Sequence, residues 1–296
     1  MSSTKADTFG PTVDGAWLTE HLNDPQLNIF DATVILDPDS WQANSGRNTF
    51  DEAHIPGAQF VDLISELSDP QGDVGLDGGV HAYKLPKPDV IADVLQRYGV
   101  GDDSTVVVYD TSAGMWAARL WWMLRQSGFV NVAVLDGGYA QWVAENRPVT
   151  SDTTQPVVAN APFTVRPRPE LFASKEDVLG RLGDTNTVLV NALWPEQFRG
   201  EAQTPLPRKG RIPGSVNVPF TETIDESGRV HDSDTLAKLF ADAGVNGDKQ
   251  VVTYCGGGIA ASSVALALAR VGIDAAVYDG SLAEWALDPE LPLAVG

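Results

Sequence analysis

The sequence contains a single cysteine, Cys255, among its 296 residues. One thiol cannot form an intrachain disulfide or a four-cysteine metal site, so both kinds of stabilised small domain are excluded. Basic residues are also scarce, with 20 Lys and Arg against 40 Asp and Glu, which gives a formal net charge of −20. Because this charge repels the phosphates of nucleic acids and of anionic membranes, we expect neither as a partner.

Long apolar runs are missing as well. Residues 1–10 hold no apolar segment typical of a signal peptide, and no run of about 18 apolar residues occurs in the chain. We therefore predict a cytoplasmic protein that does not enter a membrane. The remaining composition, with 43% hydrophobic residues, is that of a globular protein, and the length suggests two domains.

Three short motifs occur twice in the same order, which indicates that the chain arose by duplication. They are an Ile-Pro-Gly motif (54–58 and 211–215), an apolar run ending in Tyr-Asp or Tyr-Cys (105–110 and 250–255), and an Asp-Gly motif ending in Trp (136–142 and 279–285). The separation between copies is largest at the first motif. The first copy therefore carries an insertion, which we place at the Gly- and Asp-rich segment 69–79.

Short apolar strands alternate with helical patterns in each copy, which is typical of a parallel sheet covered by helices. We predict an α/β fold with two tandem domains, each a mainly parallel sheet flanked by helices, at 12–150 and 170–296, joined by a Pro-rich linker at 151–169. In the second copy we expect strands at 188–190, 216–218, 251–254 and 275–278, a helix start at Ser174, and helices at 233–243 and 260–271.

Cys255 lies between a predicted strand and a predicted helix, and three glycines follow it. Open α/β sheets bind ligands at the carboxyl ends of their strands, and the N–H groups of a glycine-rich loop with the helix dipole favour an anion there. A thiolate in this position is a nucleophile. The first copy has Asp110 at the matching position, so the fold itself does not require a cysteine.

Two other interpretations of the loop are weaker. The glycines fit a relaxed dinucleotide-binding pattern, but the acidic residue expected after the next strand, Asp279, has a counterpart in Asp136, where no such glycine pattern exists. A cysteine phosphatase would need an arginine six residues after its cysteine, and Ala261 stands there.

Taken together, these motifs resemble the tandem rhodanese-domain sulfurtransferase family, which comprises the thiosulfate and 3-mercaptopyruvate sulfurtransferases. The resemblance extends from about Thr12 to Leu293 and rests on residues 31–32, 54–58, 135–138, 211–220, 278–281 and the cysteine loop. It implies a silent first domain with Asp110 and a catalytic second domain. There Cys255 would take a sulfur atom from a donor as a persulfide and pass it to an acceptor, with no metal or organic cofactor.

The same resemblance implies roles for further residues. The loop that would hold the persulfide comprises Gly256, Gly257, Gly258, Ile259 and Ala260. It is similar to the Cys-Gly-Ser-Gly-Val loop of mercaptopyruvate enzymes and lacks the basic pair of thiosulfate specialists, so 3-mercaptopyruvate is the expected donor and thiosulfate the alternative. The catalytic serine and aspartate of the mercaptopyruvate enzymes are replaced by Gly257 and Ile64, and His81 is the candidate for their histidine.

Two arginines bind the donor carboxylate in that family. Gln197 stands at the first position, Arg208 matches the second, and Arg199 is a candidate substitute for the first. The expected partners are a small-molecule sulfur donor and a thiol or cyanide acceptor, with a thioredoxin-like reductant as a further candidate. A hypothesis of another class is a persulfide carrier or binding module without turnover.

Overall fold

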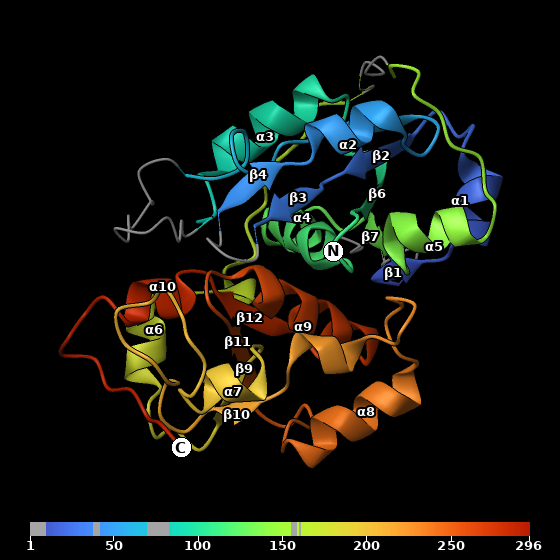
Figure 1. The fold of residues 1–296 in the computed structure, drawn as a ribbon. Helices are drawn as coiled ribbons and strands as arrows, with labels where there is room; N and C mark the ends of the chain where they lie inside the picture. The colour runs from blue at the N-terminus through green and yellow to red at the C-terminus, as the bar shows by residue number, and fades with distance from the viewer. Residues whose placement is uncertain (1–9, 38–41, 70–82, 155–158, 160) are drawn as a thin grey trace.

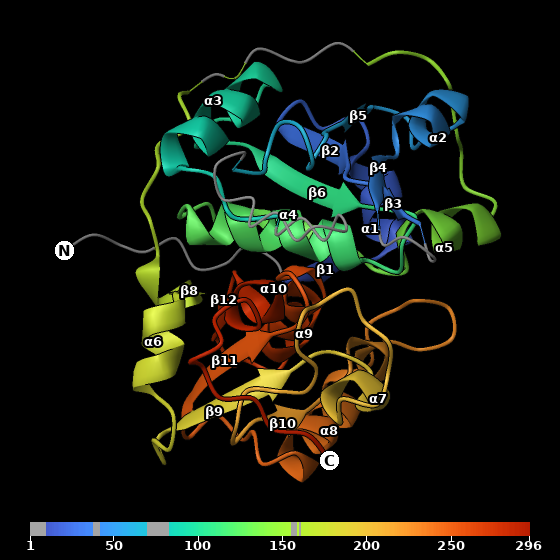
Figure 2. The same cartoon turned by 60° about the vertical axis from the view of Figure 1, so that its left-hand side comes forward.

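The computed structural model describes residues 10–37, 42–69, 83–154, 159 and 161–296. Its two halves have the same architecture (Figures 1 and 2). The strands of the first sheet lie in the order β1-β7-β6-β2-β5 and those of the second in the matching order β8-β12-β11-β9-β10. Every neighbouring pair is parallel, which confirms both the predicted duplication and the α/β fold class.

The strands are short and mostly apolar. The first sheet consists of β1 (Thr12–Val13), β2 (Leu27–Asp31), β5 (Ala58–Phe60), β6 (Thr105–Tyr109) and β7 (Val132–Leu135). The second consists of β8 (Phe172–Ala173), β9 (Thr187–Asn191), β10 (Val216–Asn217), β11 (Gln250–Tyr254) and β12 (Ala275–Tyr278). The four strands predicted for the second copy are thus confirmed. In the first half, β3 (Val34–Leu36) and β4 (Ala43–Ser45) also form an antiparallel ribbon.

Ten helices cover the sheets in the described part of the chain. Those of the first half are α1 (Gly15–His21), α2 (Arg47–Glu52), α3 (Pro88–Arg97), α4 (Met115–Gln126) and α5 (Gly138–Ala144). Those of the second are α6 (Lys175–Gly180), α7 (Pro195–Phe198), α8 (Ser233–Asp242), α9 (Ile259–Arg270) and α10 (Ser281–Trp285), with 3₁₀ turns at Pro169–Leu171 and Phe220–Thr223. None of these helices is long and apolar enough to cross a membrane.

Local chemistry explains several helix ends. Ser174 accepts a hydrogen bond from the Asp177 N–H and Asp177 accepts one from the Ser174 N–H, so a capping box begins α6 at the predicted place. The predicted helices at 233–243 and 260–271 are confirmed as α8 and α9. Most of the predicted insertion, residues 70–79, lies outside the described residues.

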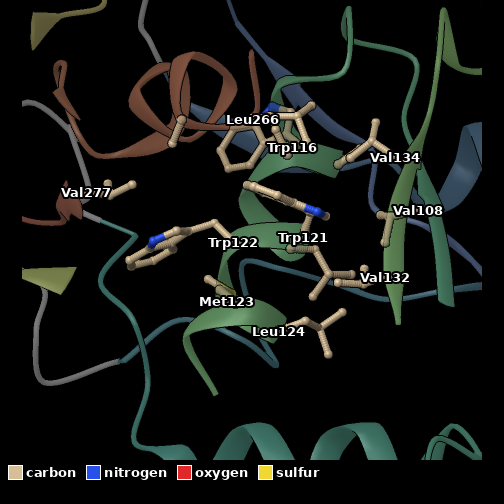
Figure 3. Close-up of a cluster of buried hydrophobic side chains, with 14 of the residues drawn as sticks. Val108, Trp116, Trp121, Trp122, Met123, Leu124, Val132, Val134, Leu266 and Val277 are labelled. Carbon is tan, nitrogen blue, oxygen red and sulfur yellow. The ribbon is translucent and has the colours of Figure 1, made fainter. Parts of the chain in front are cut away.

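The two halves share one apolar core. Helices α4 and α9 pack against each other between the two sheets (Figures 1 and 2). Figure 3 shows three tryptophans of α4, Trp116, Trp121 and Trp122, among apolar side chains from both halves, and all three are at most 3% exposed. Because α4 belongs to the first half and α9 to the second, burial of their apolar faces holds the halves together.

Candidate active site

The thiol of Cys255 lies between the central strand of the second sheet and the start of α9. Cys255 directly follows β11 and is 2% exposed. Its Sγ accepts a hydrogen bond from the Gly258 N–H, with a distance of 3.1 Å between N and Sγ. The N–H groups of Ile259, Ala260 and Ala261 belong to the first turn of α9 and therefore have no acceptor within the helix. The sulfur thus lies where backbone N–H groups and the helix dipole favour negative charge.

Of the three loop glycines, only Gly258 has a positive φ. Gly258 has a φ of +83°, and a Cβ there would come within 2.8 Å of the Asp279 carbonyl oxygen. A Cβ at Gly256 would meet no atom within 4 Å. The turn into α9 therefore needs glycine at 258.

Residues at the start of α10 hold the cysteine loop in place by hydrogen bonds to its backbone. The Cys255 N–H donates to Ser281 Oγ at 3.1 Å, and the N–H groups of Leu282 and Ala283 donate to the carbonyls of Cys255 and Gly256. Ser281 has a φ of +48° and donates its own hydroxyl proton to the Tyr278 carbonyl. The motif at 279–285 therefore positions the loop, a role that sequence reasoning did not assign to Ser281.

In the first half, Asp110 stands at the position of Cys255 and fills its own loop. The carboxylate is 1% exposed and accepts four backbone hydrogen bonds of 2.7 to 2.9 Å. Oδ1 accepts from Ser112 and Gly114, and Oδ2 accepts from Trp116 and Ala117. Burial raises the pKa of Asp110, and the four N–H bonds oppose that shift. Since both oxygens accept two bonds each, the arrangement suits the ionised form.

A buried arginine of the first half reaches the cysteine loop of the second. Arg119, on α4, is fully buried and forms an ion pair of 2.5 Å with Asp279 Oδ1. Its Nη1 would lie 3.1 Å from a Cβ at Gly258, and its Nε and Nη1 have no hydrogen-bond partner. The absence of basic residues from the loop itself therefore does not mean that no cation lies beside it. Sequence reasoning missed Arg119 because 160 residues separate it from Asp279.

Residues just after the first-half insertion complete this contact between the halves. The Leu85 N–H donates to Asp279 Oδ2 at 2.8 Å, and Lys84 Nζ pairs with Glu284 at 2.8 Å. Asp279 thus receives one bond from Arg119 and one from Leu85. The candidate His81 lies outside the described residues.

The two candidate arginines differ in their surroundings. The guanidinium of Arg208 donates to the backbone carbonyls of Trp285, Ala286, Asp288 and Leu291. Four of its five N–H groups are therefore committed to holding the segment after α10. Arg199 is half-exposed and pairs with Glu201 at 2.8 Å. The predicted role of either arginine in binding a donor stays a prediction.

Two positions that depart from the family pattern also have defined places. Ile64 packs against the main apolar core, and its N–H donates to Asp62. Gln197, on α7, has a buried Oε1 without a hydrogen-bond partner. In the described part of the chain, no cluster of three or more His, Cys, Asp or Glu side chains is placed to hold a metal ion.

Comparison with known proteins agrees with this architecture. The model of the rhodanese-like domain matches residues 14–145 and again residues 174–288. The chain belongs to the rhodanese-like sulfurtransferase family. It is 33% identical to the 3-mercaptopyruvate sulfurtransferase of Escherichia coli K12, over 95% of this chain and 96% of that protein. It is 34% identical to the human 3-mercaptopyruvate sulfurtransferase, over 92% of this chain and 91% of the relative.

A solved structure supports the same assignment. The crystal structure of SseA, a 3-mercaptopyruvate sulfurtransferase from Escherichia coli, superposes with a TM-score of 0.78 at 31% identity. The match covers 92% of this chain and 99% of SseA. Both rhodanese-like units of the chain therefore have counterparts in proteins of similar length, and only the second unit contains a cysteine.

Proposed function

We propose that this protein transfers a sulfur atom from 3-mercaptopyruvate to a thiol or to cyanide through a persulfide on Cys255. The observation that carries the proposal is the placement of the Cys255 sulfur at the start of α9, with the Gly258 N–H donating to it. The first-half copy of the loop supports the proposal, because the same kind of backbone cradle binds a carboxylate there. Negative charge on the sulfur is the state that such a cradle stabilises.

The reaction has two steps. In the first, the Cys255 thiolate attacks the sulfur of 3-mercaptopyruvate, a sulfur–sulfur bond forms and the sulfur–carbon bond breaks. The electron pair leaves with carbon as the enolate of pyruvate. The proton lost from the donor thiol balances the one that the enolate takes up to give pyruvate, and the outer sulfur stays on the enzyme as an anion. In the second step the acceptor attacks that outer sulfur and the sulfur–sulfur bond breaks. The thiolate is then restored.

The charge around the loop favours 3-mercaptopyruvate over thiosulfate. Arg119 lies beside the loop, but Asp279 neutralises it at 2.5 Å. No further basic residue stands in the loop itself. A compact dianion would therefore lack charge-assisted hydrogen bonds worth roughly 1.5–3 kcal/mol each. The names of the two relatives described above point to the same donor.

We also propose that the two halves have different roles. We assign catalysis to the second domain, residues 170–296, and a supporting role to the first, residues 12–150, with residues 151–169 as the linker. The first domain supplies Arg119 and the backbone of Leu85 to the neighbourhood of the cysteine loop. The proposed compartment is the cytoplasm, where thiol acceptors such as a thioredoxin-like reductant are available.

The test is a comparison of donors on the intact protein. Incubation with 3-mercaptopyruvate should add about 32 Da, the mass of one sulfur atom, to Cys255, and cyanide should remove it. We also expect kcat/KM with cyanide as acceptor to be higher for 3-mercaptopyruvate than for thiosulfate. An adduct with negligible turnover would indicate a persulfide carrier, and no adduct with either donor would refute sulfur transfer altogether.

A variant at Arg199 would sharpen the donor assignment. If this arginine binds the donor carboxylate, Arg199→Ala should lower kcat/KM for 3-mercaptopyruvate more than for thiosulfate. Arg199 is preferred to Arg208 for this test because its side chain makes a surface ion pair rather than four backbone contacts. Equal losses for both donors would remove Arg199 from the site.

A further inference from the structure

Two aspartates at equivalent positions, Asp136 and Asp279, join the halves. Asp136 follows β7 and Asp279 follows β12, and each accepts a backbone hydrogen bond from the opposite half. The Val230 N–H donates to Asp136 Oδ1 at 2.7 Å, and the Leu85 N–H donates to Asp279 Oδ2 at 2.8 Å. This contact is therefore repeated across the molecule and belongs to the duplicated fold.

The arginines that pair with these aspartates are not equivalent. Arg270, at the end of α9, pairs with Asp136 at 3.1 Å, and its side chain is 26% exposed. Arg119, in the second turn of α4, pairs with Asp279 at 2.5 Å, and its side chain is completely buried. Burying a guanidinium costs more free energy than leaving it at the surface. Since a partly exposed arginine suffices for Asp136, pairing with the aspartate does not explain why Arg119 is buried.

The position of Arg119 is occupied by a serine in the other half. Arg119 is the fifth residue after the N-cap Gly114, and Ser263 is the fifth residue after the N-cap Gly258. Ser263 lines a cavity of about 20 Å³ beside Asp136, and its Oγ has no hydrogen-bond partner among the described residues. This cavity has room for about one water molecule. The fold therefore accepts a small side chain here, and the arginine is specific to the helix that faces the cysteine loop.

The guanidinium of Arg119 lies against the glycine that donates to the thiol. A Cβ on Gly258 would lie 3.1 Å from Arg119 Nη1, and the Gly258 N–H donates to Cys255 Sγ. The guanidinium stacks on Trp122, whose ring centre lies 4.6 Å from Cζ. Nη2 donates to Asp279 Oδ1, whereas Nε and Nη1 have no acceptor in the described part of the chain. Because both oxygens of Asp279 accept a hydrogen bond, the cation is the less compensated member of the pair.

We infer that Arg119 is a positioning residue for the reaction of Cys255, because it places a positive charge against Gly258 that favours the anionic form of the sulfur. Asp110 needs no such charge, since four N–H groups bind its carboxylate, whereas one N–H binds the Cys255 sulfur. This inference rests on the proposed function, in which the thiolate is the nucleophile. The dipole of the ion pair favours a single negative charge in the loop and still leaves no free cation for a dianionic donor.

Few other charged or titratable groups lie on the described elements around the loop. Lys84 and Glu284 pair with each other at 2.8 Å, and their side chains are 24% and 22% exposed, so water screens their charges. Helix α9 carries no charged side chain before Arg270. Burial raises the pKa of Tyr254 and of Tyr278, so both phenols stay neutral. Among the described residues, the buried ion pair is thus the charge that acts most directly on the sulfur.

The experiment measures how fast iodoacetamide alkylates the intact protein as a function of pH. Cys255 is the only cysteine, so mass spectrometry reports this thiol alone and needs no sulfur donor. We expect the midpoint of the rate–pH curve to rise by about one pH unit in Arg119→Gln and to fall by about one pH unit in Asp279→Asn. Both variants break the same ion pair, so a merely structural role would move both midpoints in the same direction or move neither.

Two control variants complete the series. Arg119→Lys keeps the charge, and Arg270→Gln breaks the ion pair at the opposite end of α9, so both midpoints should stay within about 0.3 pH unit of the wild type. Circular dichroism checks that each variant is folded. If Arg119→Gln does not fold, Asp279→Asn decides alone, because only the removal of negative charge lowers the midpoint.

Shifts of the same sign, or an unchanged midpoint in Asp279→Asn, overturn the inference. A wild-type protein that forms no persulfide would instead refute the proposed function, and the alkylation result would stand.

Discussion

The Asp110 loop and the Cys255 loop differ in content although their backbones agree. In the first, a side chain fills the cradle and satisfies four N–H groups. In the second, the shorter cysteine side chain takes one N–H, and the first-turn N–H groups of Ala260 and Ala261 have no acceptor within α9. The loop backbone is therefore common to both halves, and the residue at its centre determines how many of the loop N–H groups have a side-chain acceptor.

The largest expected effect separates these two residues directly. Cys255→Ser should lower sulfur transfer by at least about 10⁴-fold, because a hydroxyl without an adjacent base is a poor nucleophile. Asp110→Asn should retain most of the activity, since its loop contains no thiol. Single-turnover transfer to cyanide measures both, and circular dichroism checks the fold. Similar losses in the two variants would contradict a silent first domain.

The next effect concerns the ion pair that joins the halves at the loop. Arg119→Gln leaves the carboxylate of Asp279 buried without its cation, so we expect the free energy of unfolding to fall by about 3–5 kcal/mol. The matched control is Lys238→Gln, which breaks an ion pair with Asp242 on the surface of α8 and should cost at most about 0.5 kcal/mol. Urea denaturation gives both values. Equal costs would show that Arg119 is not a structural link between the halves.

A third variant removes the carboxylate of Asp110 from its loop. Asp110→Ala removes the acceptor of four N–H groups, two of them buried, and we expect a loss of about 2–4 kcal/mol in unfolding free energy. Sulfur transfer by the folded fraction should stay within about twofold of the wild type, because Cys255 is untouched. A loss of stability without a loss of activity would show that Asp110 has a structural role and no catalytic one. A variant as stable as the wild type would mean that water molecules accept hydrogen bonds from the four N–H groups as well as the carboxylate does.

A smaller effect on stability comes from the residue that ends the strand next to each loop. Asp31 ends β2 and Asn191 ends β9, and each side-chain oxygen accepts the N–H of the residue two positions on. Burial raises the pKa of Asp31 from 3.8 to about 6, and the nearby charge of Asp110 adds to the shift. The folded protein therefore keeps this proton up to about pH 6, whereas the unfolded chain releases it near pH 4.

Since the folded state holds the extra proton, stability should fall as the pH rises from about 4 to about 6. Asp31→Asn removes this loss, so we expect it to raise the free energy of unfolding at pH 7 by about 1–3 kcal/mol and to flatten the slope between pH 4 and 6. Asn191→Asp should do the opposite in the second half. Urea denaturation at several pH values measures both. An unchanged slope in Asp31→Asn would assign the titration to another group.

Much of the molecule follows from local sequence. The strands of the second sheet, the capping box at Ser174 and the helices at 233–243 and 260–271 could be predicted because apolar periodicity and capping chemistry act within a few residues. The duplication could be read from repeated motifs. The position of Cys255 between a strand and a helix followed from the same patterns, and the resemblance to a known family supplied its expected chemistry.

The surroundings of Cys255 were decided by tertiary structure. Arg119 comes from α4 of the other half, Ser281 from the turn before α10, and the carbonyls that hold Arg208 from the segment after α10. These contacts join residues far apart in the chain, so no local pattern encodes them. Even within the Asp110 loop, where all partners are close in sequence, the four N–H bonds depend on how the backbone turns into α4. The sequence by itself indicated the candidate nucleophile and predicted the two parallel sheets. The packing of α4 on α9 decided which charges meet beside Cys255, because only folding brings buried side chains of the two halves within contact distance.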